Sequence, residues 1–240
     1  MQETPGHASA AAMDLPPLNA ADLESLRDKR IFFGHRSVGA NIVEWGIPAV
    51  YDEFGVDPPR LGDAATESGG QFIDSWLVQT DDPMDKVKDF DRWMRSAGAE
   101  ASLDIAFMKL GYVDITETTD VPALFSSYLE VMDRLEADFP SVTFIHSTIT
   151  VTDWRLDLDA IIEEFNALMR AEYRMPGELI DLAWAVSNCT DGTVRAGVTE
   201  AGDPYLAICP EYTDDGGHLN AVGAKAAATV LLRTLAGVET

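Results

Sequence analysis

The chain has 240 residues, of which 41 are acidic and 17 are basic, so its formal net charge at pH 7 is −24. This length suits one large α/β domain, or two small ones, with a full hydrophobic core. The charge disfavours nucleic acid as a partner because phosphate backbones are bound by clustered cations, and no apolar run approaches the ~20 residues of a membrane-spanning helix.

The first twenty residues lack the basic start and apolar centre of a secretory signal. We therefore expect a mobile N-terminal leader over residues 1–20 and a single domain over residues 21–240. Cys189 and Cys209 flank a stretch rich in Gly and Asp, and they are either a disulfide or two buried thiols. Together with the leader, they favour an extracytoplasmic protein, secreted or periplasmic, over a cytoplasmic one.

Apolar runs alternate with amphipathic stretches along the rest of the chain. The helix over 81–98 is marked by Asp82 as its cap, Pro83 in its first turn and Gly98 at its end. Alternating strands and helices predict a parallel sheet covered by helices on both faces, and such sheets bind ligands at the carboxyl ends of their strands. The expected strands are 30–34, 103–111, 142–150 and 178–186, and the other expected helices are 38–45, 48–54, 121–138, 157–173 and 220–236.

An acidic residue and a histidine stand three positions apart just before the last expected helix, in "DDGGHLN". Asp215 can turn its carboxylate onto the imidazole of His218 within one loop, and so hold the ring tautomer and stabilise the imidazolium. The alternative reading is a polar turn in which Asn220 caps the helix.

Ser37 follows the first expected strand, in "FFGHRSVGANI". A serine in the first turn of a helix is usually a cap. The same position also places its hydroxyl near a helix N-terminus, where a developing oxyanion is stabilised. With a base supplied by another loop, Ser37 becomes a candidate nucleophile.

These motifs resemble those of the SGNH/GDSL hydrolase superfamily, over about residues 30 to 236. The resemblance rests on the Gly-x-x-Ser-x-Gly turn at Ser37 and on the Asp-x-x-His-Leu-Asn-x-x-Gly block that begins at Asp215. The usual Gly-Asp-Ser is replaced here by "GHRS", with His35 two residues before the serine, which indicates a divergent branch with a His-x-Ser-x-Gly signature. The resemblance implies a three-layer α/β/α sandwich with a five-stranded, mostly parallel, flavodoxin-like sheet and a single catalytic domain.

The resemblance also implies an oxyanion site. The family's second block supplies a glycine, for which "ESGGQF" offers Gly69 or Gly70. Its third block is Gly-x-Asn-Asp, but the chain has "GYVD", where Gly111 is kept and Val113 replaces the asparagine. The candidates to supply the missing side-chain donor are Asn41, Lys109 and Gln71.

For several other polar and aromatic residues, the sequence leaves more than one role open. His35 is expected to orient the loop, line the pocket or act as another base, and Arg36 to lie at the surface or the pocket rim. His146 is either a buried histidine with its hydrogen bonds satisfied or a pocket residue. Asp74 and Ser75 form a literal Asp-Ser without an evident strand-turn context, and Trp76, Trp154 and Trp184 are sugar-site or core residues.

The resemblance implies a metal-independent serine ester hydrolase without a cofactor, in which Ser37 attacks, His218 transfers the proton and Asp215 orients His218. The expected substrates are short acyl (O-acetyl) esters, of small molecules or saccharides. An O-acyltransferase with the same residues, a non-catalytic carbohydrate-binding protein of this fold and a metal-dependent phosphoesterase using His35, Asp215 and His218 are the alternatives. The oligomeric state is not predicted.

Overall fold

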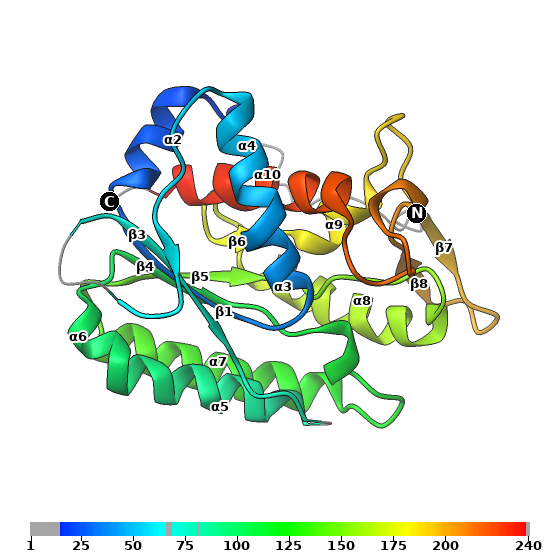
Figure 1. Cartoon of the computed structure of the whole chain (residues 1–240). Helices are drawn as coiled ribbons and strands as arrows, with labels where there is room; N and C mark the ends of the chain where they lie inside the picture. The colour runs from blue at the N-terminus through cyan, green and yellow to red at the C-terminus, as the bar shows by residue number, and fades with distance from the viewer. Residues whose placement is uncertain (1–14, 66–68, 81, 239–240) are drawn as a thin grey trace.

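The computed structural model describes residues 15–65, 69–80 and 82–238, and its centre is a six-stranded sheet (Figure 1). The strand order is β2-β3-β1-β4-β5-β6 and every neighbouring pair is parallel. Without the two-residue edge strand β2, this order is the flavodoxin-like one, so the predicted sheet is confirmed with one strand added. The strands are β1 (Arg30–His35), β2 (Leu61–Gly62), β3 (Gln71–Trp76), β4 (Ile105–Met108), β5 (Thr143–Ser147) and β6 (Leu179–Ile180).

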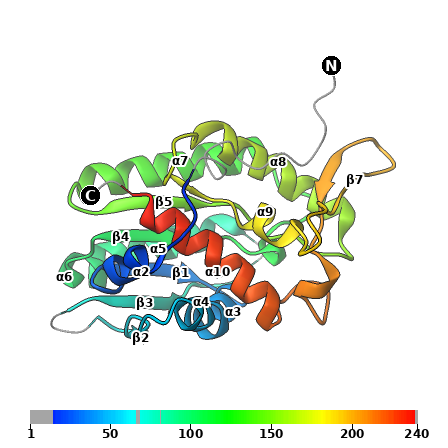
Figure 2. The same ribbon diagram turned by 90° about the horizontal axis from the view of Figure 1, so that it is seen from above.

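Helices cover both faces of the sheet, as Figures 1 and 2 show, so the three-layer prediction is confirmed. Adjacent residues of β1 point to opposite layers: Phe32 stacks on Trp93 of one layer, while Phe33 lies on the other face and stacks on Phe107 of β4. One layer contains α2 (Ala20–Arg27), α3 (Val38–Asn41), α4 (Ile47–Glu53) and α10 (Ala221–Ala236), and the other contains α5 (Pro83–Trp93) and α7 (Val121–Asp138), with α8 (Leu156–Glu172) beside α7.

Local sequence signals explain most of the helix boundaries. Asp82 caps α5 by accepting a hydrogen bond from the N–H of Met84, and Asn220 caps α10 through the N–H groups of Val222 and Gly223. Short segments complete the chain: η1 (Ile42–Gly46), η2 (Met94–Gly98), α6 (Ala99–Ala101), η3 (Tyr112–Asp114), α9 (Leu182–Ser187), β7 (Ala196–Val198), β8 (Pro204–Leu206) and η4 (Pro210–Tyr212). The π-helical segment η1 joins α3 to α4, so the expected helices 38–45 and 48–54 form one nearly continuous segment, and η2 extends α5 to the end of the expected helix 81–98.

The predicted strand over 178–186 is wrong for most of its length. Only β6 is extended, and α9 follows it because the Asp181 carboxylate accepts the N–H of Trp184 and caps a helix. A continuous apolar run is buried equally well as a strand or as a short helix, so periodicity did not separate the two. Strand β3 was missed because its second half is not buried: Asp74 and Ser75 are partly buried and Trp76 is exposed.

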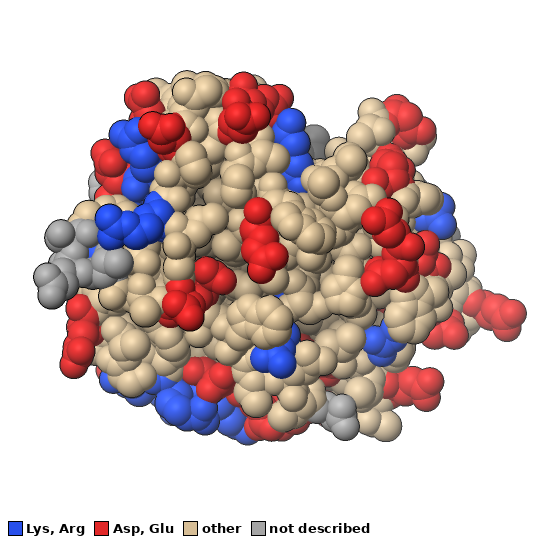
Figure 3. Space-filling model, viewed as in Figure 1, with Lys and Arg blue, Asp and Glu red and all other residues tan. Residues whose placement is uncertain are grey.

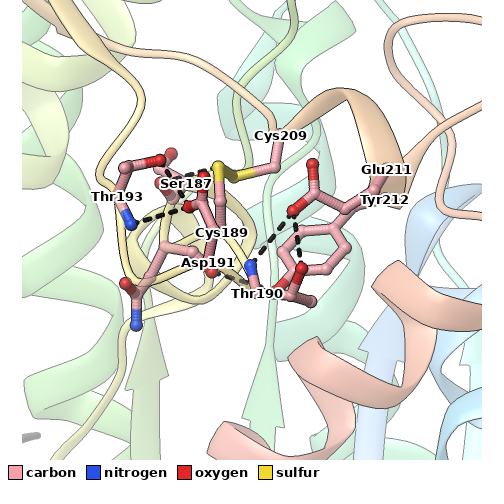
Figure 4. Close-up of a disulfide and its surroundings, with 9 residues drawn as sticks. Ser187, Cys189, Thr190, Asp191, Thr193, Cys209, Glu211 and Tyr212 are labelled. Atoms are coloured by element: carbon pink, nitrogen blue, oxygen red, sulfur yellow. Dashed lines mark hydrogen bonds between the residues drawn. A yellow bond between two sulfur atoms is a disulfide. The ribbon is translucent and has the colours of Figure 1, made fainter.

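A disulfide joins Cys189 to Cys209, whose Cα atoms are 5.6 Å apart, which decides between the two sequence alternatives (Figure 4). The bond closes the segment that carries the antiparallel hairpin of β7 and β8. Beside it, Glu211 accepts hydrogen bonds from the N–H and the hydroxyl of Thr190. Since Glu211 stands only four residues before Asp215, this cross-link lies next to the histidine loop.

The N-terminal leader is described from residue 15 onward, and residues 1–14 lie outside the described residues. Leu15 and Leu18 are buried, and the guanidinium of Arg233 on α10 donates a hydrogen bond to the carbonyl of Pro16. The last part of the expected leader is therefore packed against the C-terminal helix. In the described part of the chain, no helix combines the length and the apolar character needed to cross a membrane.

Candidate active site

Ser37 occupies a strained turn between β1 and α3. Its φ of 49° and ψ of −104° lie in a region that residues with a Cβ atom rarely adopt. Such strain costs on the order of 1–3 kcal/mol and is concentrated at functional sites. The side chain makes no capping hydrogen bond, so the cap alternative from the sequence does not hold. The half-buried hydroxyl is presented at the carboxyl edge of the sheet.

The turn depends on close packing between Gly39 and His35. A Cβ atom on residue 39 would lie 2.4 Å from the Cβ and Cγ atoms of His35, which no side chain tolerates. Glycine therefore lets α3 approach the end of β1. This contact explains why the turn needs glycine two residues after the serine.

Three side chains meet in a hydrogen-bonded row. The Oγ of Ser37 lies 2.5 Å from Nε2 of His218, and Nδ1 of His218 lies 2.7 Å from Oδ2 of Asp215. The other carboxylate oxygen of Asp215 accepts the N–H groups of Gly217 and His218. These interactions, led by the hydrogen bond from His218, hold the pKa of Asp215 well below its usual range. Asp215 is thus a fixed anion that orients the imidazole.

Asn41 connects this row to α3. Its Oδ1 accepts the backbone N–H of Leu219, the residue after His218, at 3.2 Å. Asn41 lies four residues after Ser37, and a helical side chain leans toward the N-terminal turn of its helix. The Asn41 amide is therefore held on the side of α3 that carries Ser37.

A buried ion pair between Lys86 and Asp114 holds the segment 111–114, which corresponds to the family's third block. Asp114 accepts the N–H of Gly111 at 2.6 Å and the ammonium of Lys86 at 2.5 Å, and both charged side chains are buried. The N–H of Gly111 is thus committed to a side chain. Val113, where the family has asparagine, is 37% exposed.

Lys109 is fully buried at the end of β4, and its ammonium donates to the carbonyl of Leu110. Burial, followed by the nearby Lys86 ammonium, lowers the pKa of Lys109 to about 7. It lies beside β1, because its backbone N–H donates to the carbonyl of Gly34. Lys109 is therefore a buried residue next to Gly34, three positions before Ser37.

The second-block expectation is wrong. Gly69 and Gly70 precede β3, and the carbonyl of Gly69 accepts a hydrogen bond from Arg30 at the start of β1. Since β1 and β3 are parallel, these glycines lie at the amino edge of the sheet, opposite Ser37. Gln71 begins β3 at the same edge, and its amide donates to Ala64, so it is also excluded as an oxyanion donor.

The segment after β3 reaches the serine turn instead. The N–H of Leu77 donates to the carbonyl of His35 at 2.8 Å. Next to it, the exposed ring of Trp76 lies 4.7 Å from the guanidinium carbon of Arg36. The sequence has no glycine in this segment. Matching the family's blocks in chain order therefore selected Gly69 and Gly70, which precede β3 instead of following it.

His35 and His146 are both buried. Nε2 of His35 lies 3.3 Å from the carboxylate of Asp74 on β3, and its Nδ1 has no hydrogen-bond partner among the described residues. Burial lowers the pKa of both histidines. His146 bonds to the Tyr128 hydroxyl at 2.9 Å and stacks on Tyr173, so it is a satisfied histidine of the α7 layer and not a pocket residue.

The fold places two aromatic side chains, Tyr112 and Trp154, near His218 or its loop. The ring of Tyr112 meets the imidazole edge to face at 6.3 Å. Trp154 is 61% exposed and borders the loop, because a Cβ atom on Gly216 would lie 2.6 Å from its Cδ1 atom. Trp184 is partly buried in α9.

In the described part of the chain, no group of potential metal ligands includes Asp215 or His218. Within residues 15–65, 69–80 and 82–238, one group of His, Cys, Asp and Glu side chains is close enough to share an ion, and it consists of Cys189, Cys209 and Glu211. The disulfide occupies both sulfur atoms. His35, Asp215 and His218 do not gather around a common point, which removes the geometric basis of the phosphoesterase alternative.

Comparison with solved structures identifies the fold. Over 87% of this chain and 96% of the other, the lipase/acylhydrolase from Enterococcus faecalis superposes with a TM-score of 0.53 at 15% identity. A protein assigned to the G-D-S-L lipolytic family from Desulfitobacterium hafniense DCB-2 gives 0.50 at 10% identity, over 87% of this chain and all of that one. The chain has the fold of the G-D-S-L hydrolases.

A carbohydrate esterase family 3 protein from Talaromyces cellulolyticus gives a TM-score of 0.49 at 15% identity, over 84% of this chain and 92% of the other. No protein-family model and no curated protein sequence matches the chain. At these identities, the likeness establishes the G-D-S-L fold, and the chemistry must be argued from the site itself.

Proposed function

We propose that the protein is a serine ester hydrolase of the SGNH/GDSL type that works through an acyl-enzyme. The observation that carries this proposal is the row from Ser37 through His218 to Asp215, with its distances of 2.5 Å and 2.7 Å. The fold and the strained backbone of Ser37 support it.

In the proposed mechanism, Ser37 Oγ attacks the ester carbonyl while Nε2 of His218 takes its proton. The imidazolium is stabilised by the Asp215 carboxylate and returns the proton to the leaving alcohol. Water then attacks the acyl-serine with His218 as base. The N–H of Ser37, at the start of α3, donates to the oxyanion.

Asn41 is the proposed second oxyanion donor, in place of the asparagine that Val113 replaces. Its Oδ1 is held by the N–H of Leu219, so its NH2 group has a fixed direction one helical turn from Ser37. Lys109 is a weaker candidate because its ammonium is buried and bonded to a carbonyl. Gly111 is weaker still, since its N–H is taken by Asp114.

Hydrolysis is the proposed reaction, and acyl transfer to a sugar hydroxyl is the alternative that the same open site admits. The side chains of His218 and Asp215 are 48% and 57% exposed, so water reaches the acyl-enzyme directly. Short acyl esters, such as O-acetyl groups on saccharides, are the proposed substrates. The non-catalytic binding alternative has to explain why Ser37 keeps a strained backbone without a capping bond.

Hydrolysis of p-nitrophenyl acetate and butyrate tests the proposal. Ser37→Ala and His218→Ala should lose nearly all turnover, since loss of a nucleophile or base costs roughly a millionfold in a comparable triad. Ser75→Ala, which changes the literal Asp-Ser on β3, is the matched control and should hydrolyse both esters like the wild type. Turnover that survives in Ser37→Ala would refute the proposed mechanism.

A further inference from the structure

A groove lies between α8 and the β7–β8 hairpin. Its volume of about 1060 Å³ is large for a ligand site. Trp154 is among the residues that line it. Its helical wall extends from Leu156 to Ala167, about 17 Å at ~1.5 Å per residue. The shape suits an extended ligand.

Trp154 connects the groove to the catalytic loop. The residue before it, Asp153, donates its N–H to the carbonyl of Gly216 at 3.0 Å, and Trp154 itself borders Gly216. Gly216 lies between Asp215 and His218 in the chain. A ligand bound along the groove would therefore reach the triad past the Trp154 ring.

The rim of the groove is acidic. The exposed carboxylates of Asp157, Glu164, Glu200 and Asp203 line it, and none of the four takes part in a hydrogen bond or ion pair within the described part of the chain. Glu163, deeper in the wall, is instead paired with Arg170 at 2.6 Å. Figure 3 shows acidic side chains on the region of this face that carries β7 and β8 in Figure 1.

Among the described residues, the groove lining includes no lysine or arginine, and its remaining surface is mostly apolar. The floor includes Ile161 of α8 and the hairpin residues Val198, Pro204 and Tyr205. Arg155, next to Trp154 in the chain, faces the Trp154 ring at 5.6 Å but donates its guanidinium hydrogens to the carbonyls of Tyr112 and Ile115. The four rim carboxylates are therefore left to pair with a ligand.

We infer that this groove binds the alcohol part of the ester substrate, and that this part is a chain of amino sugars carrying ammonium groups. The inference rests on the proposed ester hydrolysis. An amino-sugar chain supplies both required features, since its hydroxyls carry the acyl ester and its ammonium groups match the rim carboxylates at intervals along about 17 Å. The exposed Trp154 ring adds a surface for a sugar face or an ammonium group.

Calorimetric binding to the Ser37→Ala protein tests the inference without turnover. The probes are a glucosamine hexamer at slightly acidic pH, the neutral N-acetylglucosamine hexamer and a lysine hexapeptide, each at low and at high salt. We expect the glucosamine hexamer to bind most tightly and to weaken with salt, because exposed charge pairs are screened.

The variant D157N/E164Q/E200Q/D203N should reduce that affinity about tenfold or more, because it removes four exposed charge pairs with the ligand at once. The matched control D52N/D57N/E100Q/E130Q removes two Asp and two Glu from exposed positions elsewhere and should bind the hexamer like Ser37→Ala alone. Trp154→Ala should weaken binding as well.

Equal loss in both four-site variants would mean unspecific attraction to an acidic protein and would overturn the inference, as would absence of hexamer binding. Equal or tighter binding of the neutral hexamer would overturn the ammonium assignment, and tighter binding of the lysine peptide would overturn the sugar assignment. Failure of p-nitrophenyl ester hydrolysis in the wild type would refute the catalytic proposal separately, whatever the hexamer does.

Discussion

The backbone N–H of Leu219 donates a hydrogen bond to Oδ1 of Asn41, across 178 positions of the chain. Through this contact, the helix that begins at Ser37 holds the loop that presents His218. This contact adds to the direct hydrogen bond between Ser37 and His218, and the NH2 group of Asn41 is the second oxyanion donor that we propose.

Replacement of Asn41 separates these two roles. Asn41→Asp keeps an oxygen for the N–H of Leu219 but loses the NH2 donor, so the melting temperature should stay within a few degrees while kcat falls about 10²–10³-fold. Asn41→Ala removes both and should lower stability as well. Steady-state kinetics on p-nitrophenyl acetate and thermal melts measure the two effects, and an Asn41→Asp enzyme with wild-type kcat would exclude Asn41 from the oxyanion site.

Gly39→Ala tests the packing under the serine turn. The new Cβ atom would lie 2.4 Å from two carbon atoms of His35, so α3 must move away from β1 and carry Ser37 with it. We expect a loss of about 1–3 kcal/mol in the free energy of unfolding, together with a drop in kcat. Gly62→Ala is the control, because its Cβ atom would meet only the Gln71 amide at 3.4 Å. Unchanged stability and activity in Gly39→Ala would contradict the packing argument.

His146 should make the protein less stable in acid. Burial lowers its pKa in the folded state below the usual 6.5, so the unfolded chain binds the proton more readily. Its contribution is therefore complete above pH 6.5 and is lost as the pH falls through the lowered folded-state value. Urea unfolding from pH 8 to pH 5 measures the effect as the difference between the wild type and His146→Asn.

The Asn variant should be less stable than the wild type at pH 8, because it leaves part of the histidine site empty and changes the partner of Tyr128. That gap should narrow toward pH 5, since the variant has no imidazole to protonate. A gap that is constant across the pH range would show that His146 does not contribute to acid sensitivity.

The disulfide should contribute to global stability and to the position of the catalytic loop. Cys189 and Cys209 are 20 positions apart in the chain, and closing a loop of about this length stabilises a fold by roughly 3 kcal/mol. Reduction, or the Cys189→Ser/Cys209→Ser variant, should lower the melting temperature and, through Glu211 and the segment leading to Asp215, reduce kcat. The reductant should leave the melting temperature of the double variant unchanged, and a wild-type protein that melts at the same temperature after full reduction would contradict the prediction.

Sequence patterns were sufficient where the physical cause is local. The pairing of Asp215 with His218 needs only a three-residue spacing in one loop, and the caps at Asp82 and Asn220 act within one helical turn. The alternation of apolar and amphipathic stretches likewise predicted the parallel sheet and its two helical layers. These features depend on chain geometry over a few residues, which a sequence records directly.

Only the tertiary structure decided which distant residues share an edge of the sheet. It placed Gly70 at the amino end of β3 and Ser37 at the carboxyl end of β1, although both stand in family-like motifs. It also brought Ser37 to His218 across 181 positions, Asn41 to Leu219 and Trp154 to Gly216. Strand direction and register determine which of these residues come into contact. Both result from burying the whole core at once, so no short stretch of the sequence specifies these contacts.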